Sequence, residues 1–394
     1  MTSTQWTWPS IFKAFAVVAG LIVQSTCVVL VQLLSLLILP FSAKAYRRYI
    51  AHTMRMWSLN LVALVQFLAP SDLVVTFDES CVDDSKATVD TAIDVEKLVQ
   101  RNHKGEVTGF NFPNRIIVTA NHQIYADWIY IWCVAYMASA HGAMKIILKD
   151  SLKSLPIFGW GMQFFDFIFL KRKLAVDQKT IVDNLKHSSK SGDPLWLVLF
   201  PEGTVISTCT RERSRQFAEK NKMEDNRYTL LPRATGLRLS TLTLDESVEW
   251  LYDFTIGYSG IPSEANPEDV YTIQGIFFFG HRPKNVHIHI RRFRVSELPK
   301  DMDAFSSWIY QRWIEKDELM AYFYKHGKFP SGADHTSASS ELQVPIRLTH
   351  SVVDLIQPWI ALLPYIPIIK WTWQLFDKLG QSFSFSPSSS SIVA

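Results

Sequence analysis

The chain has 394 residues, a length that allows one large α/β domain together with membrane segments. Its 40 basic and 37 acidic residues give a net charge of +3, which excludes the strongly basic surface that nucleic-acid binding usually needs, so we expect no nucleic-acid partner. Hydrophobic residues make up 48% of the chain, with 13 Trp and 25 Phe, which indicates surface in contact with membrane lipid.

The first predicted element is an apolar helix. Residues Ala14–Leu39 form an apolar stretch of about 26 residues, more than the roughly 20 that span a bilayer. A signal peptide is the alternative, because Ala43-Lys44-Ala45 resembles a cleavage site, but the apolar core of a signal peptide has only about 7–15 residues. We therefore predict an N-terminal transmembrane helix over about 14–39.

Basic residues are unevenly distributed around this helix. Lys13 precedes it, whereas four basic residues follow it: Lys44, Arg47, Arg48 and Arg55. Because the cytosolic side of a membrane helix carries the excess of Lys and Arg, we expect the N-terminus in the lumen of the endoplasmic reticulum. The catalytic domain is then expected to face the cytosol.

The remaining membrane and linker segments lie on either side of the predicted domain. Trp57–Ala69 is apolar but too short to span a bilayer, so it is predicted as an interfacial helix, and residues 1–70 as a membrane anchor. Residues 347–380 are apolar but contain Pro358, Pro364 and Pro367, which favours a C-terminal membrane-associated hairpin. We predict a linker over 327–346 and a disordered, serine-rich tail over 381–394.

Between these ends the patterns of strands and helices alternate. Short runs of β-branched and aromatic residues predict buried strands at Arg115–Ala120, Phe167–Lys171 and Leu195–Phe200. Helical spacing is found over Val176–Lys190 and Ala304–Lys325. We therefore predict an α/β catalytic domain over 71–326, a mixed sheet flanked by helices. Two polar segments are predicted as surface insertions: Cys81–Glu96 and Arg211–Asn226.

A histidine and an aspartate follow the first predicted strand, in the order Asn121-His122-Gln123-Ile124-Tyr125-Ala126-Asp127. In one continuous helix a separation of five residues turns two side chains about 140° apart, so these two meet only if the chain turns between them. The end of a strand supplies such a turn. There Asp127 would accept the Nδ1 hydrogen of His122 and leave Nε2 free to take a proton from an alcohol, although the same spacing is common in ordinary surface pairs.

Three later segments strengthen this interpretation, and each also has an ordinary explanation. Phe169-Leu170-Lys171-Arg172-Lys173 ends a strand and offers an arginine for a phosphate, although basic runs are often only solvated. Phe200-Pro201-Glu202-Gly203-Thr204 ends another strand, with a glycine that lets a ligand approach the backbone, although an ordinary turn can have the same residues. Leu230–Gly236 contains Pro232 and Arg233, which would add charge to the same pocket.

Taken together and in this order, NHxxxxD, FLKR, FPEGT and a proline-containing turn resemble the glycerolipid acyltransferase family. The segments NHQIYADW, GWGMQFFDFIFLKRK and LFPEGT are most similar to those of the branch that contains lysocardiolipin and lysophosphatidylinositol acyltransferases. The resemblance is strong over Pro113–Gly236, whereas Leu251–Lys325 carries no motif that can be placed. Lys171 and the segment Arg211–Asn226 depart from the simplest family pattern, which leaves the acceptor open.

The resemblance implies a role for each matched residue. His122 would be the general base and Asp127 the partner that orients it. The phosphorylated acceptor would be bound by Phe169, Arg172, Glu202, Gly203 and Thr204. The pocket would be shaped by Asn121, Pro232 and Arg233.

The implied reaction is direct transfer of a fatty acyl group from acyl-CoA, as co-substrate, to the free hydroxyl of a lysophospholipid, such as lysophosphatidylinositol, lysophosphatidic acid or lysocardiolipin. It requires no metal and no further cofactor. Two alternatives remain at this stage: a CoA-independent phospholipid transacylase with the same site, and a non-catalytic lipid-binding scaffold.

The sequence His287-x-His289 offers two possible metal ligands, because the period of two places both histidines on one face of a strand. No third ligand is evident nearby, and Ile288 and Ile290 occupy the opposite face, so an amphipathic strand is predicted. The four cysteines contain no CxxC pair, so neither a zinc site nor a disulfide framework is predicted.

Overall fold

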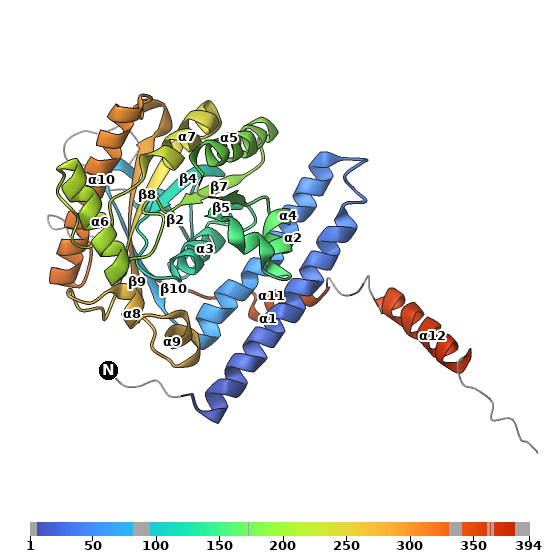
Figure 1. The fold of residues 1–394 in the computed structure, drawn as a ribbon. Coiled ribbons are helices and arrows are strands. Elements are labelled where there is room, and N and C mark those ends of the chain that lie inside the picture. The colour runs from blue at the N-terminus through green and yellow to red at the C-terminus, as the bar shows by residue number, and fades with distance from the viewer. Residues whose placement is uncertain are drawn as a thin grey trace, which may run out of the picture.

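The computed structural model describes residues 6–81, 95–171, 173–330, 341–360, 363 and 366–382. Its centre is an eight-stranded sheet in the order β10-β1-β9-β8-β4-β7-β5-β6 (Figure 1). The strands are β1 Asp72–Phe77, β4 Arg115–Ala120, β5 Met144–Lys149, β6 Ile168–Leu170, β7 Leu195–Leu199, β8 Trp250–Tyr258, β9 Asn285–Arg294 and β10 Leu342–Pro345. A separate two-stranded sheet pairs β2 Val99–Arg101 with β3 Val107–Phe110. The predicted α/β fold with a mixed sheet is confirmed.

Strand direction determines where the chain can place a site. β8, β4, β7, β5 and β6 all run parallel to their neighbours in this part of the sheet, while β9 is antiparallel to β8 and β10 to β1. The carboxyl ends of the five parallel strands therefore meet at one edge, where ligands of open α/β sheets bind. The segments that follow β4, β6 and β7 are those in which the sequence predicted chemistry.

Both faces of the sheet are buried, which explains why the predicted strands are continuously apolar. Ile116 and Val118 of β4 face one core, which also holds α2 Ala43–Leu68 and α3 Asp127–Met137. Ile117 faces a second core, formed by α5 Leu174–Ser191, α7 Ala234–Leu244 and α10 Met302–His326. Shorter or peripheral helices include α4 Phe158–Phe164, α6 Thr208–Asn221, α8 Pro267–Val270, α9 Ile273–Phe278 and α11 Ser351–Ile360.

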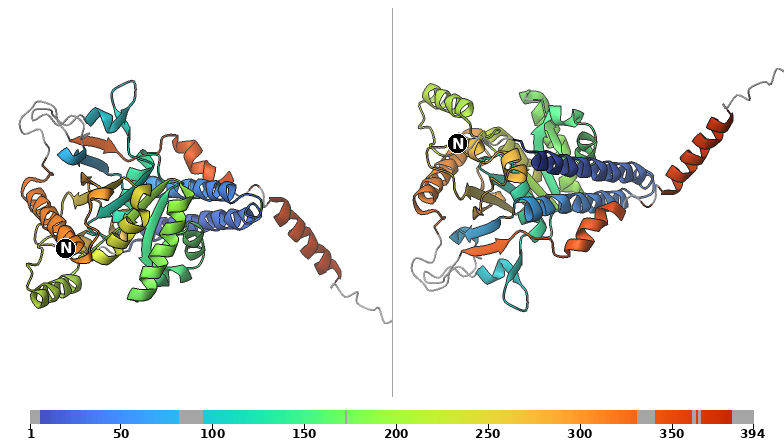
Figure 2. Two further views of the ribbon diagram at one scale, coloured as in Figure 1. Left: turned by 90° about the horizontal axis from the view of Figure 1, so that it is seen from above. Right: turned by 90° about the horizontal axis from the view of Figure 1, so that it is seen from below.

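The N-terminal apolar helix is α1 Trp8–Ser35, 28 residues with a mean hydropathy of 2.4. It is followed by α2, which at 26 residues is twice as long as the predicted segment Trp57–Ala69. The sequence interpretation missed the first half of α2 because Arg47, Arg48 and Arg55 interrupt its apolar face, whereas Ser42 caps the helix and starts it early. Figure 2 shows α1 and α2 side by side as an antiparallel pair.

Polar contacts join α1 to α2 inside this pair. The Trp57 indole N–H donates to Ser25 Oγ at 3.0 Å, and the Gln32 amide donates to Thr53 Oγ1 at 3.2 Å. Both ends of the pair also contact the domain. At one end Trp6 packs against Phe279, with ring centroids 4.7 Å apart, and at the other Arg47 bonds Asp193 at 2.5 Å. The pair is therefore attached to the domain at both ends.

Three other segments differ from the sequence-based prediction. The predicted linker over 327–346 ends in β10, which adds to the sheet edge beside β1 and is too short to show a clear period. The predicted insertion Arg211–Asn226 is largely α6, which Ser207 and Thr210 start with a capping box. The C-terminal apolar segment contains two helices, of which α11 contacts α1 and α2, while α12 Ile366–Ser382 stands away from the domain (Figure 1). Most of the insertion predicted at Cys81–Glu96 and the tail over 383–394 lie outside the described residues.

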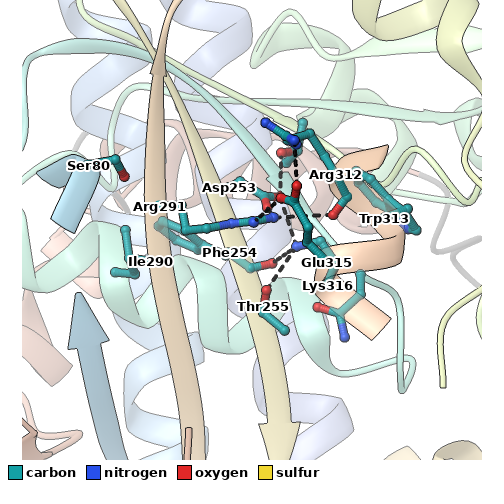
Figure 3. A network of polar contacts seen from close by, with 12 residues as sticks. Ser80, Asp253, Phe254, Thr255, Ile290, Arg291, Arg312, Trp313, Glu315 and Lys316 are labelled. Carbon is teal, nitrogen blue, oxygen red and sulfur yellow. Dashed lines mark hydrogen bonds and ion pairs between the residues drawn. The ribbon is translucent and has the colours of Figure 1, made fainter. Parts of the chain in front are cut away.

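A buried cluster of charges fastens α10 to the sheet (Figure 3). Asp253 of β8 accepts from Lys316 of α10 at 2.8 Å and from Arg291 of β9 at 2.8 Å, and Lys316 also donates to the Phe254 carbonyl at 2.7 Å. Burial alone would raise the pKa of Asp253, but Lys316 and Arg291 lower it to about 2. Arg291 continues the network to Glu315 at 2.7 Å.

This cluster generates a stability prediction. Lys316→Met keeps the length of the side chain but leaves Asp253 with Arg291 as its only positive neighbour in the cluster, and removing one partner of a buried ion pair costs about 3 kcal/mol. We expect a lower unfolding midpoint in urea, measured in detergent micelles. Arg215→Ala, whose ion pairs with Glu212 and Glu219 are exposed, is the control and should change little. An unchanged midpoint for Lys316→Met would mean that Arg291 alone neutralises Asp253.

Candidate active site

The turn after β4 brings the predicted histidine and aspartate into contact. His122 Nδ1 lies 2.8 Å from Asp127 Oδ2, and the same oxygen accepts the backbone N–H of Ile124 at 3.1 Å, which closes the turn. Asp127 is the first residue of α3, where the helix dipole favours a negative charge. This geometry leaves Nε2 of His122 as the ring nitrogen that faces away from the carboxylate.

Burial differs sharply between the two side chains. The Asp127 side chain is fully buried, whereas 17% of the His122 side chain is exposed. The ring of Phe200, at the end of β7, stacks on the imidazole with centroids 4.3 Å apart. His122 therefore has one rigid face, one held nitrogen and one accessible edge, an arrangement suited to proton transfer.

The accessible edge of His122 lines a cavity of about 1100 Å³. Its walls are predominantly apolar and come from seven helices, α1, α2, α3, α4, α5, α7 and α9, as well as from the strand ends. Among the lining residues are Val17, Leu21 and Val28 of α1, Trp57 and Leu61 of α2, Trp128 and Trp132 of α3, Gly161 of α4 and Phe277 of α9. The N-terminal helix pair is thus one wall of the same cavity that holds the candidate base.

Two of the other predicted residues reach this cavity beside His122. Gly203 follows β7 with φ of +74°, a conformation that a side chain would strain, and Arg233 lies next to it. The Arg233 backbone N–H donates to the Pro201 carbonyl at 2.8 Å, which ties the turn before α7 to the turn after β7. Arg233, Thr235 and Gly236 all line the cavity, so the start of α7 faces it.

Glu202 lies behind this wall and does not line the cavity. It is buried, and its Oε1 accepts the Trp313 indole N–H of α10 at 3.2 Å. Burial raises the pKa of Glu202 to about 8, against the opposing effects of Trp313, the Leu230 and His122 backbone amides and Lys316. The carboxyl of Glu202 therefore packs against α10 and is not among the groups that face the cavity with His122.

Five further predicted residues lie away from the cavity lining or outside the described part of the chain. Asn121 is fully buried and pairs with the Ile256 backbone of β8 through both its amide nitrogen, at 2.9 Å, and its oxygen, at 2.7 Å. Its role is therefore to fasten the turn to the sheet. Phe169, Thr204 and Pro232 are not among the residues that line the cavity. Arg172 lies outside the described residues.

One neighbour of the His122–Asp127 pair was missed entirely. The Tyr258 hydroxyl, at the end of β8, donates to Asp127 Oδ1. No motif marks this tyrosine, because it is 131 residues from Asp127 and becomes its neighbour only when β8 pairs with β4. The signal available in the sequence was an apolar strand that ends in a polar aromatic residue.

The histidine pair of β9 serves another purpose. His289 Nδ1 lies 2.9 Å from Thr76 Oγ1, and His287 packs edge-on against Phe323. Burial lowers the pKa of each to about 4, so both are neutral core residues. Among the residues that the structure describes, no three His, Cys, Asp or Glu side chains gather as metal ligands.

Comparison with known proteins shows the family of the chain. The chain matches the acyltransferase family over residues 104–242 and the acyltransferase C-terminus family over residues 277–353. It is 37% identical over 305 residues to an uncharacterized acyltransferase of Schizosaccharomyces pombe, covering 77% of this chain and 81% of that protein.

Two relatives carry more specific names. The chain is 34% identical over 360 residues to the 2-acyl-1-lysophosphatidylinositol acyltransferase of Saccharomyces cerevisiae, covering 82% of this chain and 85% of that protein. It is 34% identical over 223 residues to lysocardiolipin acyltransferase 1 of Danio rerio, covering 56% and 55%. The chain therefore belongs to the lysophospholipid acyltransferase family.

Proposed function

We propose that the chain is an acyl-CoA-dependent lysophospholipid acyltransferase, which moves a fatty acyl group from acyl-CoA to the free hydroxyl of a lysophospholipid. The observation that carries this proposal is His122, held at Nδ1 by a buried carboxylate and open to a large apolar cavity. Both substrates combine a long apolar chain with an anionic headgroup, so their site needs such a cavity directly beside a base.

The proposed reaction is a direct transfer that needs no covalent enzyme intermediate. His122 Nε2 takes the proton of the acceptor hydroxyl while the hydroxyl oxygen bonds to the thioester carbonyl carbon. The carbon–sulfur bond then breaks, and the thiolate of CoA leaves and takes up the proton from His122. Asp127 stabilises the positive charge that the imidazole carries between these two events.

The start of α7 supports the binding of a phosphate near His122. α7 has no side-chain cap, so the backbone N–H groups of its first turn are available to a ligand. Arg233 adds a positive charge at this point, and Gly203 leaves the backbone uncovered. We assign the acceptor phosphate to this corner, in place of the Phe169, Glu202 and Thr204 set that the resemblance implies.

We further propose that α1 and α2 lie along one face of the membrane, with the N-terminus on the same side as the catalytic domain. At 28 residues α1 is about 42 Å long at 1.5 Å per residue, yet both ends of the α1–α2 pair contact the domain. Exposed aromatic residues supply a surface for lipid, among them Phe12, Phe15 and Phe41, which are 71–90% exposed. This replaces the transmembrane orientation with a lumenal N-terminus expected above, and keeps the domain on the cytosolic side of the endoplasmic reticulum.

The first test replaces the proposed base. His122→Ala should lower acyl transfer by about 10²–10⁴-fold without loss of folded protein, because it removes the proton acceptor. Membranes with each protein are incubated with labelled acyl-CoA and lysophosphatidylinositol, lysophosphatidic acid or lysocardiolipin. His187→Ala, an exposed histidine on α5, is the control and should retain full activity. Transfer by wild type that persists without acyl-CoA would instead identify a transacylase, and full turnover by His122→Ala would refute the assignment of the base.

A second test concerns the cavity as the site of the acyl chain. A side chain at Gly161 would enter the space between α4 and α1, where Val29 lies 3.6 Å from the position of a Cβ atom. Gly161→Leu should therefore shift the preference towards shorter acyl-CoA, measured as kcat/KM across a series of chain lengths. Gly20→Leu adds the same group to α1 outside the cavity lining and should not change the preference. An unchanged profile for Gly161→Leu would place the acyl chain elsewhere.

The third test addresses membrane orientation. Cys209 is the exposed cysteine of the catalytic domain, whereas Cys27, Cys81 and Cys133 are buried. In sealed microsomes a membrane-impermeant maleimide should label Cys209 of wild type. It should also label Trp8→Cys in a Cys209→Ser background, because Trp8 is exposed and lies on the same side as the domain. Labelling of Trp8→Cys only after detergent would restore the transmembrane interpretation.

A further inference from the structure

Asp127 uses its two carboxylate oxygens for different partners. Oδ2 receives His122 and the Ile124 backbone N–H, while Oδ1 receives the hydroxyl of Tyr258. Among the described residues, Tyr258 is the only hydrogen-bond donor to Oδ1. Because Asp127 is fully buried, an oxygen without a partner there would be costly, and the carboxylate would rotate or take up a proton to avoid it.

Tyr258 is itself held on several sides. It ends β8, where its backbone pairs with Val286 of β9, and its ring packs between those of Tyr130 and Tyr271. Burial, reinforced by Asp127, raises the pKa of Tyr258 well above its usual range, so the phenol stays protonated and remains a donor. The hydroxyl therefore has a fixed position and a fixed role relative to the carboxylate.

We propose that Tyr258 is a positioning residue for acyl transfer, which acts through Asp127 to keep His122 in its reactive orientation. The proposal rests on the function proposed above for His122. The hydroxyl locks the plane of the carboxylate so that Oδ2 stays aimed at Nδ1, and it shares the negative charge that would otherwise act on the imidazole alone. Three side chains are thereby connected by hydrogen bonds: Tyr258 of β8, Asp127 of α3 and His122 in the turn after β4.

Other titratable groups surround these three side chains and are part of their electrostatics. Tyr130 of α3 and Tyr271, which follows α8, face Tyr258, and Cys133 of α3 lies beside Tyr130. Glu268 of α8 faces His122, and burial raises its pKa. Asp127 is the acidic group in direct contact with both His122 and Tyr258, so the removal of the Tyr258 hydroxyl acts first on that carboxylate.

The main experiment is Tyr258→Phe in the full-length protein in membranes, which removes the hydroxyl and keeps the ring. We expect kcat to fall about tenfold while KM for acyl-CoA stays within about twofold. The acidic limb of the kcat/KM–pH profile should move up by about half a pH unit, because an unshared Asp127 charge holds a proton on His122 more strongly. Tyr271→Phe is the matched control, since its hydroxyl donates to the Ser259 carbonyl at 2.7 Å and does not contact Asp127.

Two further measurements distinguish positioning through Asp127 from a general structural role of Tyr258. In an Asp127→Asn background, Tyr258→Phe should cause no further loss of kcat, because its effect passes through that carboxylate. If Tyr258→Phe fails to fold, 3,5-difluorotyrosine at position 258 keeps the ring and the hydroxyl but makes a stronger donor, and the acidic limb should then move to lower pH.

Failure of this proposal is distinguishable from failure of the proposed function. Unchanged kcat and pH profile in Tyr258→Phe or in the fluorinated protein, with activity abolished in His122→Ala, would overturn the positioning role and leave the base in place. An equal loss of kcat in the wild-type and Asp127→Asn backgrounds would also overturn it. Full activity in His122→Ala would overturn the proposed function itself.

Discussion

Complete burial of the Asp127 carboxylate is the constraint on which the candidate site depends. A carboxylate removed from water needs a hydrogen-bond partner for each oxygen, and here the partners come from His122 and Ile124 in the turn after β4 and from Tyr258 at the end of β8. The turn cannot open without exposing these groups. Asn121 secures the same turn by pairing with the Ile256 backbone, so the position of His122 is set by β8 as much as by its own strand.

The N-terminal helices complete the candidate site, and in the proposed orientation they also carry its membrane-facing surface. Residues of α1 and α2 line the cavity with His122, while other residues of α1, such as Phe12 and Phe15, are exposed. In the proposed function, a lysophospholipid in the bilayer would meet a wall that is continuous with the cavity, which would shorten the path of its hydroxyl to His122. The long apolar helix, which by length and composition alone predicts a membrane span, here has a structural role in the catalytic domain.

What the sequence predicted follows from local rules, and what it missed depends on tertiary pairing. Apolar runs predicted β4, β6 and β7, and polar residues at a strand end predicted the His122–Asp127 contact. Both features depend on residues that are close together in the sequence. β10 and Tyr258 were missed because each depends on a contact with a residue or strand far away in the sequence, β1 for β10 and Asp127 for Tyr258. The direction of the Glu202 side chain could not be predicted from its sequence neighbours, because Gly203 and Pro201 line the cavity while Glu202 itself bonds Trp313 of α10.

The buried charges behind the sheet explain why the two family regions form one unit. Trp313 and Lys316 belong to α10, within the C-terminal family region, yet Trp313 bonds Glu202 and Lys316 bonds Asp253 of β8. The same helix thus holds both the turn after β7, which carries Gly203, and the strand that ends in Tyr258. A displacement of α10 would move the proposed phosphate-binding corner and the support of Asp127 together, so α10 acts on the site through packing and charge, although none of its residues lines the cavity.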